Sequence, residues 1–362
     1  MRPVLRAILC LGAMVLALNA PARAAEPAGP MIEVMAQGEK IEGLPLDWNP
    51  VAVHLLGRDG QLWQFGVDQV SEYRETSAHF RPYSPSEFRA TLLRELGHGY
   101  EVSGTAHYLI AHPRGQREKW AERFEDLYRS FVHYFSVRGF KLNAPLFPLV
   151  GIVCASHADF ARYAATQGSV SSGVQGYYDL KSNRISLYDM GGGADSAHWR
   201  KNAAVLIHEA THQIAFNTGV NSRYCPPPTW VVEGLAMLFE APGIYDPRSY
   251  IRPAERVNQG RLEVFRRIVL PRHRPELLSA IVASDRLFRI HPGAAYAEAW
   301  AFTFFLAESE PRKYVRYLKR AAARSPFHAY TASERAADFT AVFGDDWRML
   351  EARFLRFMAG VK

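Results

Sequence analysis

Hydrophobic and polar positions alternate through residues 31–75, which is the period expected of β-strands with one buried face. Within this region two apolar runs, at residues 51–56 and 61–65, flank the turn-forming sequence Arg58-Asp59-Gly60. Strand-like runs joined by such a turn predict a hairpin. We therefore expect a small β-rich lobe in this part of the chain.

The period becomes helical further along. Ser84, followed three positions later by Glu87, is a capping signal that predicts a helix through Leu96, and Gly97 predicts its end. A second helix is predicted from residue 115 onward, where large apolar residues recur every three or four positions. This apolar stripe comprises Trp120, Phe124, Leu127, Phe131 and Phe135.

Three further runs predict strands. The uninterrupted apolar run 149–154 is typical of a buried strand. Residues 176–180 and 184–188, on either side of a turn-forming Lys-Ser-Asn sequence, predict a second hairpin. Its free edge, which carries Tyr177 and Tyr178, could pair with an extended peptide substrate, or the hairpin could simply complete the sheet.

Helical periodicity dominates from residue 250 to the C-terminus. The predicted helices are 255–268, 275–288, 294–308, 311–323 and 346–358. Together with the strands, this pattern predicts an α+β fold, in which a mixed sheet with an edge hairpin precedes a helical C-terminal part. We expect a signal peptide over residues 1–24, the small β-rich lobe over 25–113 and the main domain over 114–362.

Composition is that of an ordinary globular protein, with 48% hydrophobic and 22% charged residues among 362. The exception is the N-terminus, where two arginines precede an apolar run followed by Ala22-Arg23-Ala24. This arrangement is typical of a secretory signal peptide cleaved after Ala24, and the apolar run is too short for a stable membrane span. We therefore expect an exported protein, periplasmic or secreted, without an integral membrane span after cleavage.

Removal of the signal peptide would lower the formal charge from +7 to +4, because it takes away three arginines and no acids. The sequence lacks a basic run interleaved with aromatic residues, which is the pattern that would indicate nucleic-acid binding. Two cysteines remain, Cys154 and Cys225. Export permits a disulfide between them, but the apolar surroundings of Cys154 favour a buried thiol. The sequence leaves this disulfide and the oligomeric state open.

The clearest chemical signal is the sequence HEATH at residues 208–212, inside an apolar run. On a helix, His208 and His212 lie one turn apart on one face, so that their imidazoles can bind one zinc ion. Glu209 lies beside that face, close enough to take a proton from a metal-bound water as a general base. The spacing predicts metal-assisted hydrolysis.

A second segment, residues 229–239, supplies the third ligand. Three prolines precede it, and Thr229 is expected to cap its helix. Glu233 lies among apolar residues, where a carboxylate without a partner is costly, so a zinc ion shared with the two histidines would account for it. Gly234 and Ala236 are expected to let this helix approach the histidine helix closely.

These residues resemble the gluzincin zinc metallopeptidases of the peptidase MA group. The resemblance rests on HEATHQ at residues 208–213 and WVVEGLA at residues 230–236, and it is closest to uncharacterised bacterial domains of that group. It implies a gluzincin-like fold with an HExxH helix and a Glu-ligand helix, and it implies Glu209 as general base. The implied ligands of the single zinc ion are His208, His212 and Glu233.

The sequence departs from the best-known gluzincins. Met237 stands where thermolysin-like enzymes have an aspartate that orients a histidine, so Glu240 or Asn217 could supply that acceptor instead. The Gly-x-Met-Glu-Asn signature of aminopeptidase N-like proteins is absent, which argues against aminopeptidase specificity. Similar bacterial domains carry a tyrosine where this chain has Tyr296. Its hydroxyl is therefore a candidate donor to the oxyanion, with a core tyrosine as the alternative.

The sequence thus predicts an exported zinc metallohydrolase, in the first place a peptidase, which cleaves an amide bond in a peptide or protein substrate. One alternative is a non-catalytic cell-envelope binding protein with a structural zinc site. Another is a zinc amidase that acts on cell-wall peptides. Glu209 favours the peptidase and amidase hypotheses over the binding protein, because a binding protein needs no base beside the metal.

Overall fold

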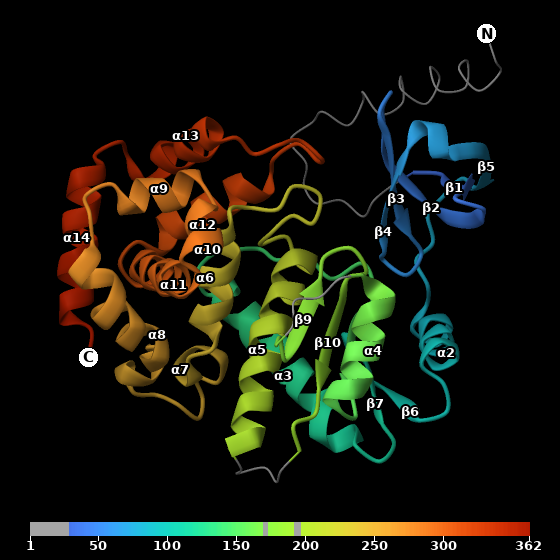
Figure 1. Cartoon of the computed structure of the whole chain (residues 1–362), viewed down its shortest axis with the longest axis horizontal. Helices are drawn as coiled ribbons and strands as arrows, with labels where there is room; N and C mark the ends of the chain where they lie inside the picture. The colour runs from blue at the N-terminus through green and yellow to red at the C-terminus, as the bar shows by residue number, and fades with distance from the viewer. Residues whose placement is uncertain (1–28, 169–172, 192–196) are drawn as a thin grey trace.

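Figure 1 shows a computed structural model of the chain, which describes residues 29–168, 173–191 and 197–362. The predicted signal peptide lies outside the described residues. The fold is α+β, and an N-terminal antiparallel sheet and a mixed sheet are followed by a largely helical C-terminal part. Within the described ranges, no helix combines the length and the apolar character needed to cross a membrane.

The N-terminal sheet has five antiparallel strands in the order β4-β3-β2-β1-β5. They are β1 (Met31–Ala36), β2 (Glu39–Trp48), β3 (Ala52–Gly57), β4 (Leu62–Gly66) and β5 (Val70–Ser77). The predicted hairpin is confirmed as β3 and β4, and its turn uses the positive φ of Gly60. Alternate residues of β1 and β3, including Val34, Val53 and Leu55, form a core within this lobe.

The second sheet is mixed, with the strand order β6-β7-β8-β10-β9. Its strands are β6 (Tyr100–Gly104), β7 (Tyr108–Pro113), β8 (Leu149–Cys154), β9 (Gly176–Asp179) and β10 (Arg184–Tyr188). The central β8 runs parallel to both of its neighbours. Leu149 and Val153 enter one core and Val150 and Ile152 another. Burial on both faces explains why this strand reads as an uninterrupted apolar run.

Helices cover both faces of the second sheet. Through Phe88 and Phe160, α2 (Pro85–Leu96) and α4 (His157–Gln167) pack on one face. The other face is covered by α3 (Arg117–Ser136) and α5 (Ala197–Asn217). The predicted apolar stripe of α3 is buried, and Ser84 caps α2 as predicted.

Residues 85–113, which the sequence grouped with the N-terminal lobe, supply α2, β6 and β7 to this second layer. The N-terminal lobe itself contacts the second sheet through the turn between β3 and β4. There the amide of Leu62 donates to the carbonyl oxygen of Lys181 over 2.8 Å, in the turn between β9 and β10. The division of the chain into separate domains stays a prediction.

From residue 229 the chain is largely helical. The helices are α6 (Thr229–Phe239), α7 (Pro242–Tyr245), α8 (Gln259–Val264), α9 (Leu277–Ala283), α10 (Arg286–Ile290), α11 (Pro292–Ser309), α12 (Pro311–Ala322), α13 (Ala332–Phe343) and α14 (Trp347–Gly360). Predictions for α11, α12 and α14 are confirmed. The helix predicted over 275–288 is instead two short helices, because the backbone is extended at Ser284. Helix α13 was not predicted, although Thr331 and Glu334 form a capping box at its start.

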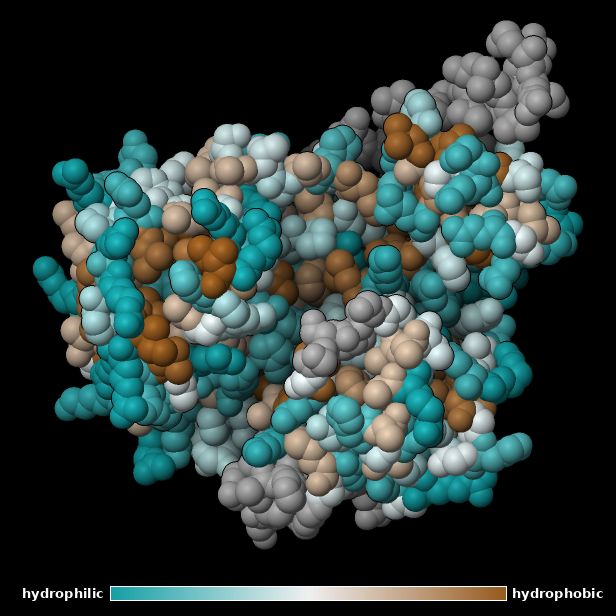
Figure 2. All heavy atoms as spheres, in the orientation of Figure 1, coloured by the Kyte–Doolittle hydropathy of each residue, from teal (hydrophilic) through white to brown (hydrophobic). Residues whose placement is uncertain are grey.

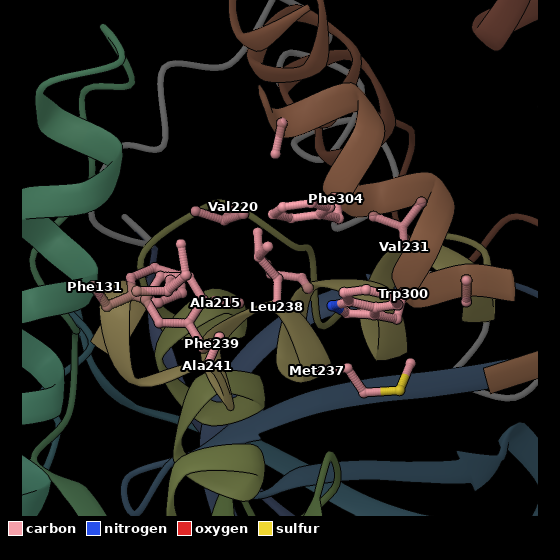
Figure 3. Close-up of a cluster of buried hydrophobic side chains, with 14 of the residues drawn as sticks. Phe131, Ala215, Val220, Val231, Met237, Leu238, Phe239, Ala241, Trp300 and Phe304 are labelled. Carbon is pink, nitrogen blue, oxygen red and sulfur yellow. The ribbon is translucent and has the colours of Figure 1, made fainter. Parts of the chain in front are cut away.

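The largest core lies where α3, α5, α6 and α11 pack together. Figure 3 shows part of it, with Phe131 of α3, Leu238 and Phe239 of α6, and Trp300 of α11 among the labelled side chains. Helix α11 is buried on almost every side, and its closest partner is α6. The two cysteines are both buried and free, so the disulfide between Cys154 and Cys225 that the sequence permitted is not formed.

Candidate metal centre

Helix α5 places His208 and His212 one turn apart, as their spacing predicts. The two Nε2 atoms lie 3.1 Å apart, and the rings are nearly perpendicular, at 86°. Their side chains are 18% and 9% exposed, so each keeps only a small accessible surface. On the face drawn in Figure 2 the molecular surface is hollowed between the helical part and the second sheet, in the region where Figure 1 places α5 and α6.

Glu233 joins the two histidines from α6. Its Oε2 lies 3.3 Å from Nε2 of His208 and 3.7 Å from Nε2 of His212. One ligand atom from each of the three side chains lies within 4.8 Å of the others, so the group could hold one metal ion. The structure therefore brings together the three ligands that the sequence predicted from two separate segments.

Helix α6 uses its small residues differently from the prediction. A Cβ at Gly234 would overlap Oγ1 of Thr303 and would lie 2.7 Å from a backbone carbonyl oxygen of α11. The expectation that Gly234 serves close approach to the histidine helix is wrong, because its open side faces α11. The expected cap is also wrong. Pro228 is the N-cap residue, and the amide of Thr229 donates to Asp285 over 3.0 Å.

Burial and mutual contact set the charges of this group. Burial alone lowers the pKa of His208, but its hydrogen bonds to Glu233 and Glu240 raise the pKa well above its ordinary value. For His212, burial and the neighbouring charge of His208 lower the pKa to about 4. Burial alone raises the pKa of Glu233, yet the two histidines hold it below its ordinary value. The hydrogen bonds to the two glutamates therefore favour the protonated form of His208.

Glu240 fixes the orientation of His208. Its Oε1 accepts a hydrogen bond from Nδ1 of His208 over 2.7 Å, and its Oε2 accepts one from Nδ2 of Asn258, also over 2.7 Å. Of the two residues that the sequence offered for this contact, the structure places Glu240 there. Asn217 instead exchanges two hydrogen bonds with Asn183, of 2.7 and 2.8 Å.

Glu209 lies between the three-residue group and the edge of the second sheet. Its Oε2 accepts a hydrogen bond from the backbone amide of Tyr178 in β9 over 2.8 Å. Gly176 allows β9 to lie this close to α5, because a Cβ there would be 2.7 Å from Cγ1 of Val205. Burial and the charge of Glu233 raise the pKa of Glu209 to about 7, although His208 opposes the shift.

The two tyrosines of β9 have their side chains on opposite faces of the sheet. Tyr177 packs against Phe160 of α4, and Tyr178 stacks on Phe216 of α5 and donates to Asn183 over 2.7 Å. Because β9 pairs only with β10, its other edge is not bonded to any strand that the structure describes. Any contact of this edge with a peptide would therefore rest on its backbone, and the tyrosines hold the strand in place.

Tyr296 is half-buried on α11 and lies within electrostatic range of the site. Burial, together with the charges of Glu233 and Glu209, raises the pKa of Tyr296 to about 12, although Arg261 opposes the shift. The hydroxyl group is therefore protonated at neutral pH and can donate a hydrogen bond. Its ring packs edge-on against Phe288 of α10, with the ring centres 5.4 Å apart.

The donor set suits a zinc ion. Because His208 donates from Nδ1 to Glu240, its neutral form carries a lone pair on Nε2, beside His212 and Glu233. Such converging lone pairs are stabilised when a proton or a cation lies among them. Two imidazoles and one carboxylate are a set that catalytic zinc uses, and three protein ligands leave a further coordination position for water or substrate.

These features describe an α+β protein with a candidate metal site of the HExxH type, built from two helices. A protein-family model described as "Protein of unknown function (DUF1570)" matches residues 202–328, which is less than half of the chain. The matched segment contains the His-His-Glu group, Glu209, Glu240 and Tyr296, whereas the strand β9 lies before it. A search of curated proteins finds no match.

Two residues of the site were not recognised from the sequence. Asn258 caps α8 by accepting from the backbone amide of Arg261, and its side-chain amide also reaches Glu240. An asparagine at the start of a helical pattern is a capping signal, but the sequence pattern placed the start of this helix at residue 255. The proximity of Arg261 to Tyr296 had no signal in the sequence, because it depends on the packing of α8 against α11.

Proposed function

We propose that the protein is an exported zinc-dependent hydrolase of the gluzincin type, and specifically a peptidase that cleaves an amide bond. The observation that carries this proposal is the position of Glu209. Its carboxylate lies next to the His-His-Glu group and is anchored to the edge strand β9 by Tyr178. A structural metal site needs no such acid beside it, whereas metal-assisted hydrolysis needs a proton acceptor there.

His208, His212 and Glu233 would hold the metal ion. A bound zinc ion would supply Lewis acidity, which lowers the pKa of a water molecule and polarises a carbonyl group. Glu209 would accept the proton of the attacking water and return it to the leaving amine. The Tyr296 hydroxyl would donate a hydrogen bond to the carbonyl oxygen as negative charge develops there.

The open edge of β9 supports a peptide as the substrate. An extended peptide can pair with an unpaired strand edge through backbone hydrogen bonds, without requiring a particular side chain. The same geometry is compatible with a peptide of the cell wall, which would make the protein an amidase in the envelope. The export of the protein rests on the signal peptide predicted over residues 1–24.

The test compares zinc content and peptide hydrolysis in the wild type and in Glu209→Gln. We expect the variant to bind one zinc ion as the wild type does and to lose about 10²- to 10⁴-fold in kcat, because the proton acceptor is removed while the ligands remain. Glu276→Gln is the matched control, since Glu276 is an exposed acid on the helical part. Zinc content that is unaffected by His208→Ala, or hydrolysis that is unaffected by Glu209→Gln, would contradict the proposal.

A further inference from the structure

The half-buried Arg261 lies beside Tyr296 and has no acidic partner among the side chains that the structure describes. Its guanidinium carbon is 5.8 Å from the centre of the Tyr296 ring. Among the side chains that the structure describes, no carboxylate lies within ion-pair distance of this guanidinium, and none forms a hydrogen bond with it. The contact with the tyrosine ring stabilises the charge only in part, because a cation–π contact contributes little where water is still present.

Three other arginines on the same stretch of chain form ion pairs, whereas Arg266 and Arg272 bond to backbone carbonyl oxygens. Arg252 pairs with Glu255, Arg256 with Glu308, and Arg267 with Glu263. The exposed Arg267 has an acidic partner, whereas the half-buried Arg261 has none among the described side chains. A partly buried cation that lacks a counter-charge costs free energy, which a ligand of opposite charge would recover.

The position of Arg261 is fixed relative to the metal ligands. Asn258 begins α8, and its Oδ1 accepts from the backbone amide of Arg261 over 3.2 Å. The Nδ2 of the same asparagine donates to Glu240, which holds His208, and to the carbonyl oxygen of Met237 in α6. The first turn of α8 is therefore tied to both metal-ligand helices, and α8 packs beside α11, which carries Tyr296 (Figure 1).

The charge of Arg261 also acts on the site. It lowers the pKa of Tyr296 against the larger effects of burial and Glu233, and it contributes, after the two histidines, to the low pKa of Glu233. The geometric link between Arg261 and the site is its place beside the Tyr296 ring, on a helix turn that Asn258 ties to Glu240.

We propose that Arg261 is a specificity-determining residue that binds a carboxylate group of the peptide substrate. This inference rests on the proposed peptidase function and names a class of substrate for it. A guanidinium group offers a planar pair of N–H donors that matches the two oxygens of a carboxylate. The carboxylate belongs either to an Asp or Glu side chain near the scissile bond or to the free C-terminus of the peptide.

The experiment uses the zinc-loaded full chain and peptides that differ only in charge. Glu-containing peptides are compared with their Gln counterparts, and free C-termini with C-terminal amides, in the wild type and in Arg261→Gln. We expect the wild type to favour one carboxylate-bearing form by about ten- to a hundred-fold in kcat/KM, as for a hydrogen bond to a charged group, and Arg261→Gln to lose this preference. If Arg261→Gln abolishes the preference for Glu over Gln peptides, the carboxylate is a side chain. If it abolishes the preference for a free C-terminus over an amide, the carboxylate is the C-terminus.

Two further variants control for structural effects. Arg267→Gln removes an exposed positive charge from the same region and is expected to keep the wild-type preference. Arg261→Lys keeps the charge but not the planar pair of donors, and we expect it to restore part of the preference. Thermal unfolding of each variant reports whether the fold is retained, and the Lys variant carries the test if the Gln variant does not fold.

A binding measurement separates this inference from the peptidase proposal. The same peptides, labelled with a fluorophore, are titrated into zinc-loaded Glu209→Gln with and without Arg261→Gln. Carboxylate-dependent binding that disappears with Arg261→Gln supports the role of Arg261 even if the wild type cleaves nothing, in which case only the peptidase proposal fails. Cleavage without a preference for carboxylates, or a preference that survives in Arg261→Gln, overturns the role of Arg261 and leaves the peptidase proposal intact. Peptides that are neither bound nor cleaved overturn both.

Discussion

At the scale of single residues, two glutamates with raised pKa values illustrate how position decides function. Burial raises the pKa of Glu209 to about 7, but this residue lies beside the histidines and is held by an amide of β9. Glu298, on α11, is fully buried, and its pKa is raised to about 8 by burial and by the charge of Glu351. Neither oxygen of Glu298 has a hydrogen-bond partner among the described residues. The first arrangement suits proton transfer, whereas the second destabilises the fold at alkaline pH.

Glu298 gives the protein a predictable pH dependence of stability. The folded protein keeps this carboxyl group protonated up to about pH 8, whereas the unfolded chain releases the proton near the ordinary value of 4.5. Its contribution to stability is thus fully present below pH 4.5 and is lost as the pH rises through 8, a fall on the order of 5 kcal/mol in the free energy of unfolding. Glu298→Gln should match the wild type in acid and exceed it in stability at alkaline pH.

The measurement is urea denaturation of both proteins over that pH range. Glu276→Gln, which changes an exposed acid, should follow the wild-type curve at every pH. If Glu298→Gln and the wild type lose stability in parallel as the pH rises, the carboxyl group of Glu298 is not protonated in the folded protein and the prediction fails.

At the scale of elements, the metal ligands are held by helix packing rather than by the helices themselves. Glu233 reaches the histidines because α6 is fixed between α5 and α11, with which it makes its largest contacts. At Gly234, the next residue, α6 lies so close to α11 that a Cβ would be 2.7 Å from a backbone carbonyl oxygen. The absence of a side chain there sets the depth at which α6 lies, and therefore the distance from Glu233 to the two histidines.

We predict that Gly234→Ala destabilises the protein by about 1–3 kcal/mol, because the added methyl group overlaps Thr303 and a backbone carbonyl of α11. It should also weaken metal binding, since α6 must move together with Glu233. Denaturation and zinc titration measure the two effects. Thr303→Ala in the same chain should restore only part of the loss, because the backbone contact remains.

Gly293→Ala is the matched control at the start of α11, where a Cβ would meet no atom within 4 Å. Alanine favours a helix more than glycine, so this change should leave stability unchanged or raise it by up to about 1 kcal/mol. If Gly234→Ala and Gly293→Ala change the free energy of unfolding equally, the packing of α6 on α11 does not require a glycine at position 234.

At the scale of the whole molecule, one buried arginine connects the N-terminal lobe to the second sheet. The guanidinium group of Arg223, in the loop between α5 and α6, donates to the carbonyl oxygens of Gly60, Leu180 and Lys181 over 2.8–3.2 Å. Gly60 belongs to the lobe, and the other two residues follow β9. The loop that connects the two metal-ligand helices therefore contacts both the lobe and the edge hairpin.

We predict that Arg223→Ala loosens this connection by about 1–3 kcal/mol, because three carbonyl groups lose a charged donor at a buried position. Hydrogen exchange measures the effect. The amide of Leu62, which bonds to Lys181, should exchange faster in the variant, while amides that pair β1 with β2 should exchange at the wild-type rate. Arg74→Ala, at an exposed ion pair within the lobe, should change neither. An unchanged exchange rate at Leu62 would show that Arg223 does not hold the N-terminal lobe against the second sheet.

Local patterns predicted a large part of this structure. The capping box at Ser84, the stripe of α3 and the buried run of β8 were correct because each depends on neighbours in the sequence. The three candidate metal ligands were predicted from the spacing of the histidines and from the cost of burying Glu233. The prediction that Thr229 caps α6 was wrong, because a distant residue supplies the contact. The backbone amide of Thr229 donates to the side chain of Asp285.

The residue types and their spacing along one helix and one apolar segment were enough to identify His208, His212 and Glu233 as a group that could hold a metal ion. Tertiary structure alone decided the surroundings of that group. It placed Glu240 rather than Asn217 on His208, set Glu209 against the edge of β9, and brought Arg261 next to Tyr296. The physical reason is that these contacts join segments far apart in the chain, and their geometry follows from how helices and sheet pack rather than from any local period.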